Sequence, residues 1–236
     1  MKKTLHRAGT RGYVNHGWLE SCHTFSFAAY HNVDRMNFGV LRVLNDDKVV
    51  GGSGFGTHPH ENMEIISIPL EGDLEHKDSI GTSGVIKEGD IQVMSAGTGV
   101  FHSEQNKNSE IPVAFLQIWL FPNKKDVVPR YDQQSMDELE KQNEFYQILS
   151  PNRHDEGVWI YQDAYFNMGK FGAGAFATYQ LKNKENGLYV FVLYGDLSVE
   201  GQDLTNRDGL GLEDLHEVCF EFKKSSHVLL MEVPMV

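Results

Sequence analysis

Two short motifs in the first half of the chain set metal-binding side chains two residues apart, His58-Pro-His60 and His102-Ser-Glu104. In an extended strand, residues i and i+2 point to the same face, so each motif directs two side chains to one side of a sheet. If the two strands are neighbours, three imidazoles and one carboxylate converge on one point. Such a donor set binds a divalent transition metal and leaves coordination positions for water, O2 or a chelating substrate. The chemistry of the protein is therefore expected there.

Other polar residues compete for a place in this site. Glu64 has the strand parity of His58 and His60, so it is a rival to Glu104 as the metal-binding carboxylate, or a group that orients a ligand imidazole by hydrogen bonding. His76-Lys-Asp78 is a further i, i+2 pair, for which a charged strand edge or the rim of a cavity is the simpler interpretation. On the residues alone, the choice of carboxylate stays open.

Short apolar or alternating runs separated by glycine-containing turns must position these side chains, and this pattern is typical of an all-β protein. Strands are predicted over Met63–Leu70, Leu74–Asp78, Ile91–Met94, Val100–Glu104 and Val113–Leu120. Strands of this length and spacing predict a small barrel or jelly roll.

The second half of the chain repeats this pattern. Gly187–Asp196 resembles Met63–Asp73, because each is an apolar strand that ends in Gly-Asp, and Val228–Val233 resembles Val113–Leu120. A repeat of this kind predicts two barrels in one chain. The second half contains no His-x-His motif, so its barrel is expected to hold no metal.

A polar segment separates the two halves. Pro122–Asp132 is polar and contains proline, and Ser135–Gln142 begins with a serine three residues before a glutamate and carries apolar residues at helical spacing. The second segment predicts a short capped helix in the linker. The expected domains are an N-terminal metal-binding barrel, residues 1–132, and a degenerate C-terminal barrel, residues 133–236.

Composition narrows the class of partner. The 236 residues carry a formal net charge of -12, and the basic residues gather only in doublets such as Lys124-Lys125 and Lys223-Lys224. A protein that grips phosphate backbones needs a basic patch, so direct binding of nucleic acid is not expected. No run approaches the ~18 apolar residues that a membrane span needs.

The cysteines and the first residues bear on the compartment. Cys22 and Cys219 are the only cysteines and form no CxxC pair, which excludes a zinc ribbon or a thioredoxin-like motif. Two free thiols are typical of a reducing compartment. The basic residues of Met1–Arg7 are followed by no apolar stretch, so no secretory signal is predicted. We therefore expect a cytoplasmic protein.

The motifs resemble those of a known family. Gly52–Gly72 is similar to the first cupin motif, and Gly89–Asn106 to the second, with the histidine two residues late and Ser95 in place of the usual proline. With these departures the chain closely resembles the pirin family over residues 5 to 122 and more weakly beyond. The matching segments are Gly17–Leu19, His23–Phe27, Leu41–Asp47, His58–His60, Met63–Ile65, His76–Ser79, Gln92–Gly99 and His102–Glu104.

The resemblance implies a bicupin with one metal, usually iron, in the N-terminal barrel. The implied ligands are His58, His60, His102 and Glu104, with Glu64 nearby. It also implies a metal-dependent dioxygenase that opens the ring of a flavonol such as quercetin, using O2 and releasing carbon monoxide. Glu104 is then also the expected general base. Fe(II) is the expected ion, although the same donors accept Mn, Co, Ni, Cu or Zn.

The family includes a second role, in which eukaryotic members are nuclear transcription cofactors. By that resemblance the alternative is a regulatory protein whose metal is structural or redox-sensing and whose acidic surface contacts a protein partner. A third hypothesis is another metal-dependent cupin reaction, with flavonol cleavage as a side activity.

Overall fold

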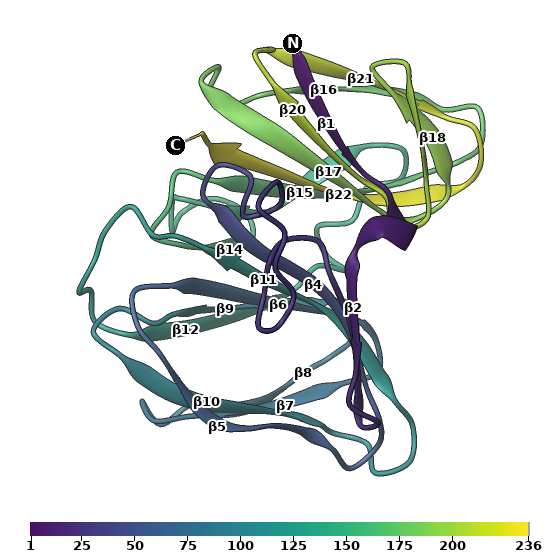
Figure 1. The fold of residues 1–236 in the computed structure, drawn as a ribbon. Helices are drawn as coiled ribbons and strands as arrows, with labels where there is room; N and C mark the ends of the chain where they lie inside the picture. Colours follow the sequence, from purple (N-terminus) through teal and green to yellow (C-terminus); the bar gives the residue numbers. More distant parts are fainter. Residues whose placement is uncertain (236) are drawn as a thin grey trace.

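Two β-barrels, each made of two facing sheets, form the computed structural model, which describes residues 1–235 (Figure 1). The only helical element within these residues is a single 3-10 turn, η1 (Ala8–Thr10). The predicted all-β fold with two tandem barrels is therefore confirmed. No helix in the described part of the chain has the length and apolar character needed to cross a membrane.

The N-terminal barrel pairs a seven-stranded sheet with a four-stranded sheet. Its strands are β2 (Gly12–Asn15), β3 (Leu19–His23), β4 (Leu41–Val49), β5 (Gly54–His60), β6 (Glu64–Glu71), β7 (Leu74–Asp78), β8 (Ser83–Ile86), β9 (Asp90–Ser95), β10 (Val100–Asn106), β11 (Val113–Leu120) and β12 (Arg130–Ser135). The larger sheet has the order β12-β9-β6-β11-β4-β3-β2 and the smaller one β5-β10-β7-β8. Both metal-binding motifs lie on the smaller sheet.

The C-terminal barrel repeats this plan. Its strands are β1 (Lys2–His6), β13 (Phe145–Ser150), β14 (Val158–Trp159), β15 (Tyr165–Phe171), β16 (Phe176–Gln180), β17 (Asn186–Tyr194), β18 (Asp196–Val199), β19 (Gln202–Thr205), β20 (Gly209–Glu213), β21 (Glu217–Phe222) and β22 (Ser226–Pro234). The larger sheet has the order β1-β20-β17-β22-β15-β13-β14 and the smaller one β16-β21-β18-β19.

The central strands of the larger N-terminal sheet are buried on both faces. One face packs against the C-terminal barrel, and the other supports the inside of the N-terminal barrel. Ile66 and Ile118 belong to an apolar core that they share with Leu229 and other residues of the C-terminal barrel. Their neighbours Ser67 and Gln117 point to the opposite face, because side chains alternate along a strand. Both are buried, and both bond a carboxylate inside the N-terminal barrel. Packing between the barrels thus fixes the strands that support the site.

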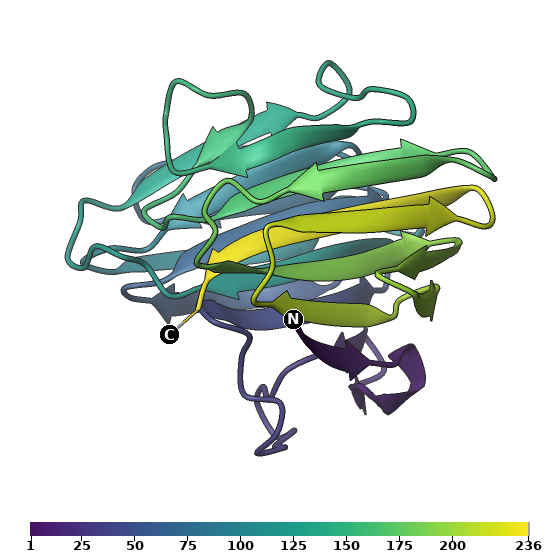
Figure 2. The ribbon, with the colours of Figure 1, turned by 90° about the horizontal axis from the view of Figure 1, so that it is seen from above.

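Strand β1 belongs to the C-terminal barrel, although it opens the chain. Its residues pair with β20 from Lys2↔Glu213 to His6↔Gly209. Seen from above, the purple β1 lies along the edge of the C-terminal sheet beside β20 (Figure 2). Strand β12 runs across position 132 and pairs with β9 throughout. Strand pairing therefore crosses the predicted division into residues 1–132 and 133–236 at two places, and that division stays a prediction.

The predicted linker helix over Ser135–Gln142 is wrong. Ser135 is the last residue of β12, and the N–H of Met136 donates to the carbonyl of Gly89 (2.8 Å). The side chain of Met136 is 5% exposed and packs in the apolar core between the barrels. Only a turn follows, closed by the N–H of Leu139 on the carbonyl of Met136. Sheet pairing and the burial of one methionine therefore outweigh the local capping pattern.

Candidate metal centre

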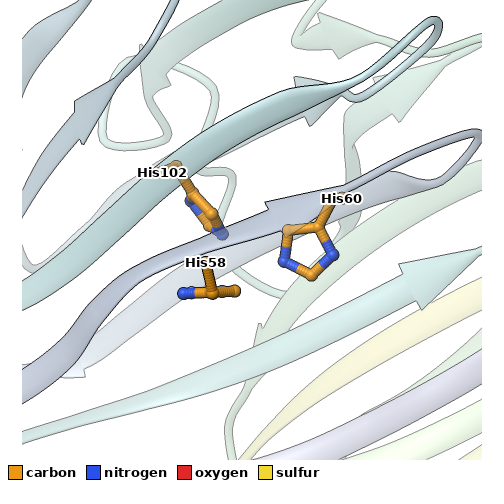
Figure 3. Close-up of side chains that lie close together, drawn as sticks. All are labelled: His58, His60 and His102. Atoms are coloured by element: carbon orange, nitrogen blue, oxygen red, sulfur yellow. The ribbon is translucent and has the colours of Figure 1, made fainter.

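The two motifs face each other on adjacent strands. Strands β5 and β10 are antiparallel, with His58 opposite His102 and His60 opposite Val100. The ring centroids of His58 and His102 are 4.4 Å apart, and His60 is 4.9 Å from each of them. One ring nitrogen from each of the three residues lies within 4.8 Å of the others. Figure 3 shows the three side chains close together, with His58 and His60 on one strand and His102 on the other.

Glu104 lies one step further along β10, beyond a β-bulge that separates it from His102. It is buried and lines the same cavity as the histidines. Its oxygens already accept two hydrogen bonds, from Ser67 Oγ (2.6 Å) and from Gln117 Nε2 (2.7 Å). Its carboxylate is not part of the group of ligand atoms that the three histidines form. Glu104 as a fourth ligand stays a prediction.

The three imidazoles are electrostatically suited to a cation. His58 Nδ1–H donates to the carbonyl of Gly56 (2.7 Å), which leaves Nε2 with its lone pair. Within residues 1–235, His60 Nε2 and both ring nitrogens of His102 are buried and have no hydrogen-bond partner. Burial lowers the pKa of His60 to about 4 and that of His102 to about 3. The rings of His60 and His102 are therefore neutral near pH 7, the state in which imidazole binds a metal, and the residues present fit a divalent ion.

A cavity of about 260 Å³ opens onto the three histidines. Its remaining wall consists of aromatic and polar side chains, namely Phe27, Asn45, Asp47, Phe55, Glu104, Gln117 and Trp119. Asn45 and Asp47 had no functional role in the sequence interpretation. The signal that identifies them is their register on β4, where polar residues occupy inward positions of the kind that Val49 fills further along the strand.

The second histidine pair is buried behind the site. The side chains of His76 and Asp78 are both 0% exposed, and His76 Nε2 lies 2.9 Å from Asp78 Oδ2. The centroid of the His76 ring lies 5.5 Å from the centroid of the His102 ring and 4.7 Å from that of the Tyr131 ring. The pair is therefore neither an exposed strand edge nor part of the cavity lining. It supports the orientation of His102 through ring packing.

Glu64 lies outside the cavity, at the start of β6. A positive φ of 48° at Asn62 breaks the extended chain between β5 and β6, so the strand parity of His60 does not continue to Glu64. The carboxyl of Glu64 accepts a hydrogen bond from Ser95 Oγ (2.6 Å). Burial raises its pKa to about 7, against the hydrogen bonds from Ser95 and from the backbone of Tyr161.

We expect Glu64→Gln to stabilise the protein more at pH 8 than at pH 5. The pKa of this carboxyl rises on folding from 4.5 to about 7. Its contribution to the free energy of unfolding is therefore fully present below pH 4.5 and is lost as the pH rises through about 7. Between pH 5 and pH 8 the free energy of unfolding of the wild type should fall by roughly 2–3 kcal/mol relative to that of the variant. Denaturant unfolding of both proteins at the two pH values measures it, and parallel pH profiles would contradict it.

The fold and the three-histidine centre define a bicupin that can bind a metal. The Pirin family model matches residues 4–120, and the model of the quercetinase C-terminal cupin domain matches residues 147–233. The chain belongs to the pirin family.

Relatives match along nearly the whole chain. Quercetin 2,3-dioxygenase of Escherichia coli strain K12 is 38% identical over 232 residues, which are 98% of this chain and 99% of the relative. A pirin-like protein of Caulobacter vibrioides is 34% identical over 222 residues, 94% of this chain and 95% of the relative. The crystal structure of the bacterial pirin YhhW from Escherichia coli in complex with nickel(II) superposes with a TM-score of 0.94 at 36% identity and covers 100% of both chains.

Proposed function

We propose that this protein is a metal-dependent dioxygenase that cleaves a flavonol such as quercetin with O2 and releases carbon monoxide. The observation that carries the proposal is the convergence of three imidazoles, two of them with buried ring nitrogens that have no partner within residues 1–235, with aromatic walls in one cavity. Phe27, Phe55 and Trp119 offer flat apolar surfaces to an aromatic ring and limit the access of water. The relatives named as quercetin 2,3-dioxygenases support the same substrate class.

His58, His60, His102 and Glu104 would hold one divalent ion, for which Fe(II) is our choice among the ions that such donors accept. The nickel(II) complex of the related YhhW supports a divalent ion in this family. When bound, the ion acts as a Lewis acid that lowers the pKa of an oxygen ligand and brings O2 and substrate together.

Glu104 is proposed to receive the proton of the flavonol 3-hydroxyl. Ser67 Oγ and Gln117 Nε2 each donate to one of its oxygens, and Trp119 Nε1 in turn donates to Gln117 Oε1 (3.1 Å). These bonds fix the plane of the carboxylate. Each carboxylate oxygen has a second lone pair, so Glu104 can accept the substrate proton while its present partners hold it in place.

The test is stoichiometry. Anaerobically purified protein reconstituted with Fe(II) should bleach the long-wavelength absorbance of quercetin while it consumes one O2 and releases one carbon monoxide per turnover. The control is the double variant His58→Ala/His102→Ala, because quercetin oxidises slowly without protein. Equal rates of oxygen uptake by the wild type and the double variant would contradict the dioxygenase proposal and favour a regulatory function.

The cavity size also supports a second candidate for the substrate. Pockets for drug-sized ligands measure ~300–1,000 Å³, and the cavity here measures about 260 Å³. A phenolic compound smaller than a three-ring flavonol therefore fits more completely and is our second candidate for the physiological substrate. Turnover of a panel of smaller phenols beside quercetin separates the two. We place the activity in the cytoplasm, which the free thiols of Cys22 and Cys219 support.

A further inference from the structure

Asn45 is a buried amide that the fold does not use. Its side chain is 2% exposed, it lines the cavity, and its Oδ1 has no hydrogen-bond partner among residues 1–235. A buried polar group without a partner is costly, and such groups are rare in folded proteins. An apolar side chain of the same size would fill this position at no such cost. The amide therefore points to a partner that enters the cavity from outside.

Asp47 provides a second polar group on the same wall. It is 3% exposed and lies two residues further along β4, so it projects from the same face as Asn45. Ser21 Oγ donates to its Oδ1, while its Oδ2 has no partner within the described chain. Burial raises the pKa of Asp47 to about 7. Near neutral pH this carboxyl can therefore either donate to a hydroxyl group or accept from one.

The wall that carries these two residues adjoins the metal centre. Asn45 pairs across the sheet with Gln117, the residue whose amide holds Glu104. Residues directly opposite on antiparallel strands have Cβ atoms about 4.5–5.5 Å apart. A ligand that fills this cavity up to the three histidines thus lies against the wall that Asn45 and Asp47 form. The two residues lie beside the metal ligands, where they can contact a second part of the same molecule.

We propose that Asn45 and Asp47 form a subsite that hydrogen-bonds a second hydroxyl group of the aromatic substrate, and that this subsite selects polyhydroxylated rings. The inference rests on the proposed function for its aromatic substrate and adds the feature by which that substrate is recognised. A hydroxyl group both donates and accepts, so one such group can satisfy the amide oxygen of Asn45 and the free oxygen of Asp47.

The test measures ligand preference without turnover. Dissociation constants are determined anaerobically on the metal-loaded protein for 3-hydroxyflavone, whose single hydroxyl is the one offered to the metal, and for quercetin, which carries further ring hydroxyls. The wild type should prefer quercetin. Asn45→Leu and Asp47→Leu should each reduce that preference about tenfold, the effect of a lost hydrogen bond to a buried polar group, while Asp47→Asn retains most of it. The affinity for 3-hydroxyflavone and the metal content should not change.

Two features keep the test decisive. Asn45→Leu removes no hydrogen bond within the described residues, so its thermal midpoint should equal or exceed that of the wild type, whereas Asp47→Leu leaves Ser21 unpaired. The matched control is Gln92→Leu, since Gln92 is also a buried amide (1% exposed) with an unpartnered nitrogen but does not line the cavity. It should keep the wild-type preference.

The outcomes separate this inference from the dioxygenase proposal. An unchanged preference in Asn45→Leu, a wild type without preference, or a wild type that binds neither flavonol overturns the subsite. If the wild type takes up oxygen with quercetin but the variants keep the wild-type ligand preference, the subsite is overturned and the dioxygenase proposal stands. A preference that Asn45→Leu abolishes, in a protein that takes up no oxygen, supports the subsite and overturns only the dioxygenase.

Discussion

Replacing His58 or His102 with Ala is expected to remove most of the metal from a protein that otherwise carries about one divalent ion per chain. Each variant deletes one of three imidazoles whose nitrogens lie within 4.8 Å of one another, and an ion that loses one of its donors is held far less firmly. The loss should exceed the ~10–100-fold that follows when only an outer hydrogen-bond partner of a ligand is changed. Elemental analysis after anaerobic purification and iron supplementation measures it.

The matched control for this experiment is Glu64→Gln. Glu64 is a buried carboxyl of the same barrel, but it bonds Ser95 and lies outside the cavity, so the variant should keep its metal. A wild-type content near zero or near two ions per chain would contradict a single site. A larger loss of metal in Glu64→Gln than in Glu104→Gln would show that the two carboxylates are wrongly assigned.

The second large effect is expected from Glu104→Gln, which should lower flavonol turnover about 10²–10⁴-fold while most of the metal remains. A general base contributes a factor of this size, and an amide accepts protons poorly although its oxygen can still bind an ion. The amide also fits its surroundings. Its oxygen can accept from Gln117 Nε2, and its nitrogen can donate to the hydroxyl of Ser67. Single-turnover bleaching of quercetin, normalised to bound metal, measures the loss.

The comparison variant for this prediction is Ser67→Ala. It keeps the carboxylate and removes one of its two donors, so it should slow turnover much less than Glu104→Gln. A metal-loaded Glu104→Gln protein that turns over at the wild-type rate would exclude Glu104 as the base and direct attention to the other carboxyl in the cavity, that of Asp47.

Local patterns were sufficient to predict the strands and the direction of the histidines. The i, i+2 spacing determines which way His58 and His60 point, but their meeting with His102 was conditional on the two strands being neighbours, and the structure meets that condition. The predicted helix after Ser135 was wrong because its pattern describes only its own turn. The decisive contacts of Met136 are with Gly89 and with the C-terminal barrel, and neither is visible in the local sequence.

Asn45 and Asp47 are site residues that the sequence did not predict, for a different reason. Within Leu41–Val49 they look like ordinary polar residues of a half-exposed strand, and only burial distinguishes them. Both line the cavity inside the N-terminal barrel, so that burial results from closure of the smaller sheet over the larger one. Glu64 shows the reverse error, because its parity with His60 assumed a continuous strand through Asn62, where the backbone turns.

The pairing of β1 with β20 has a consequence for synthesis on the ribosome. Residues 2–6 are made early, yet their partners are residues 209–213, so this edge of the second barrel stays open until nearly all of the described chain has emerged. The first barrel can form its sheets in the meantime, since domains generally fold in the order in which they are made. A segment made before the whole first barrel therefore pairs only when the second barrel is nearly complete.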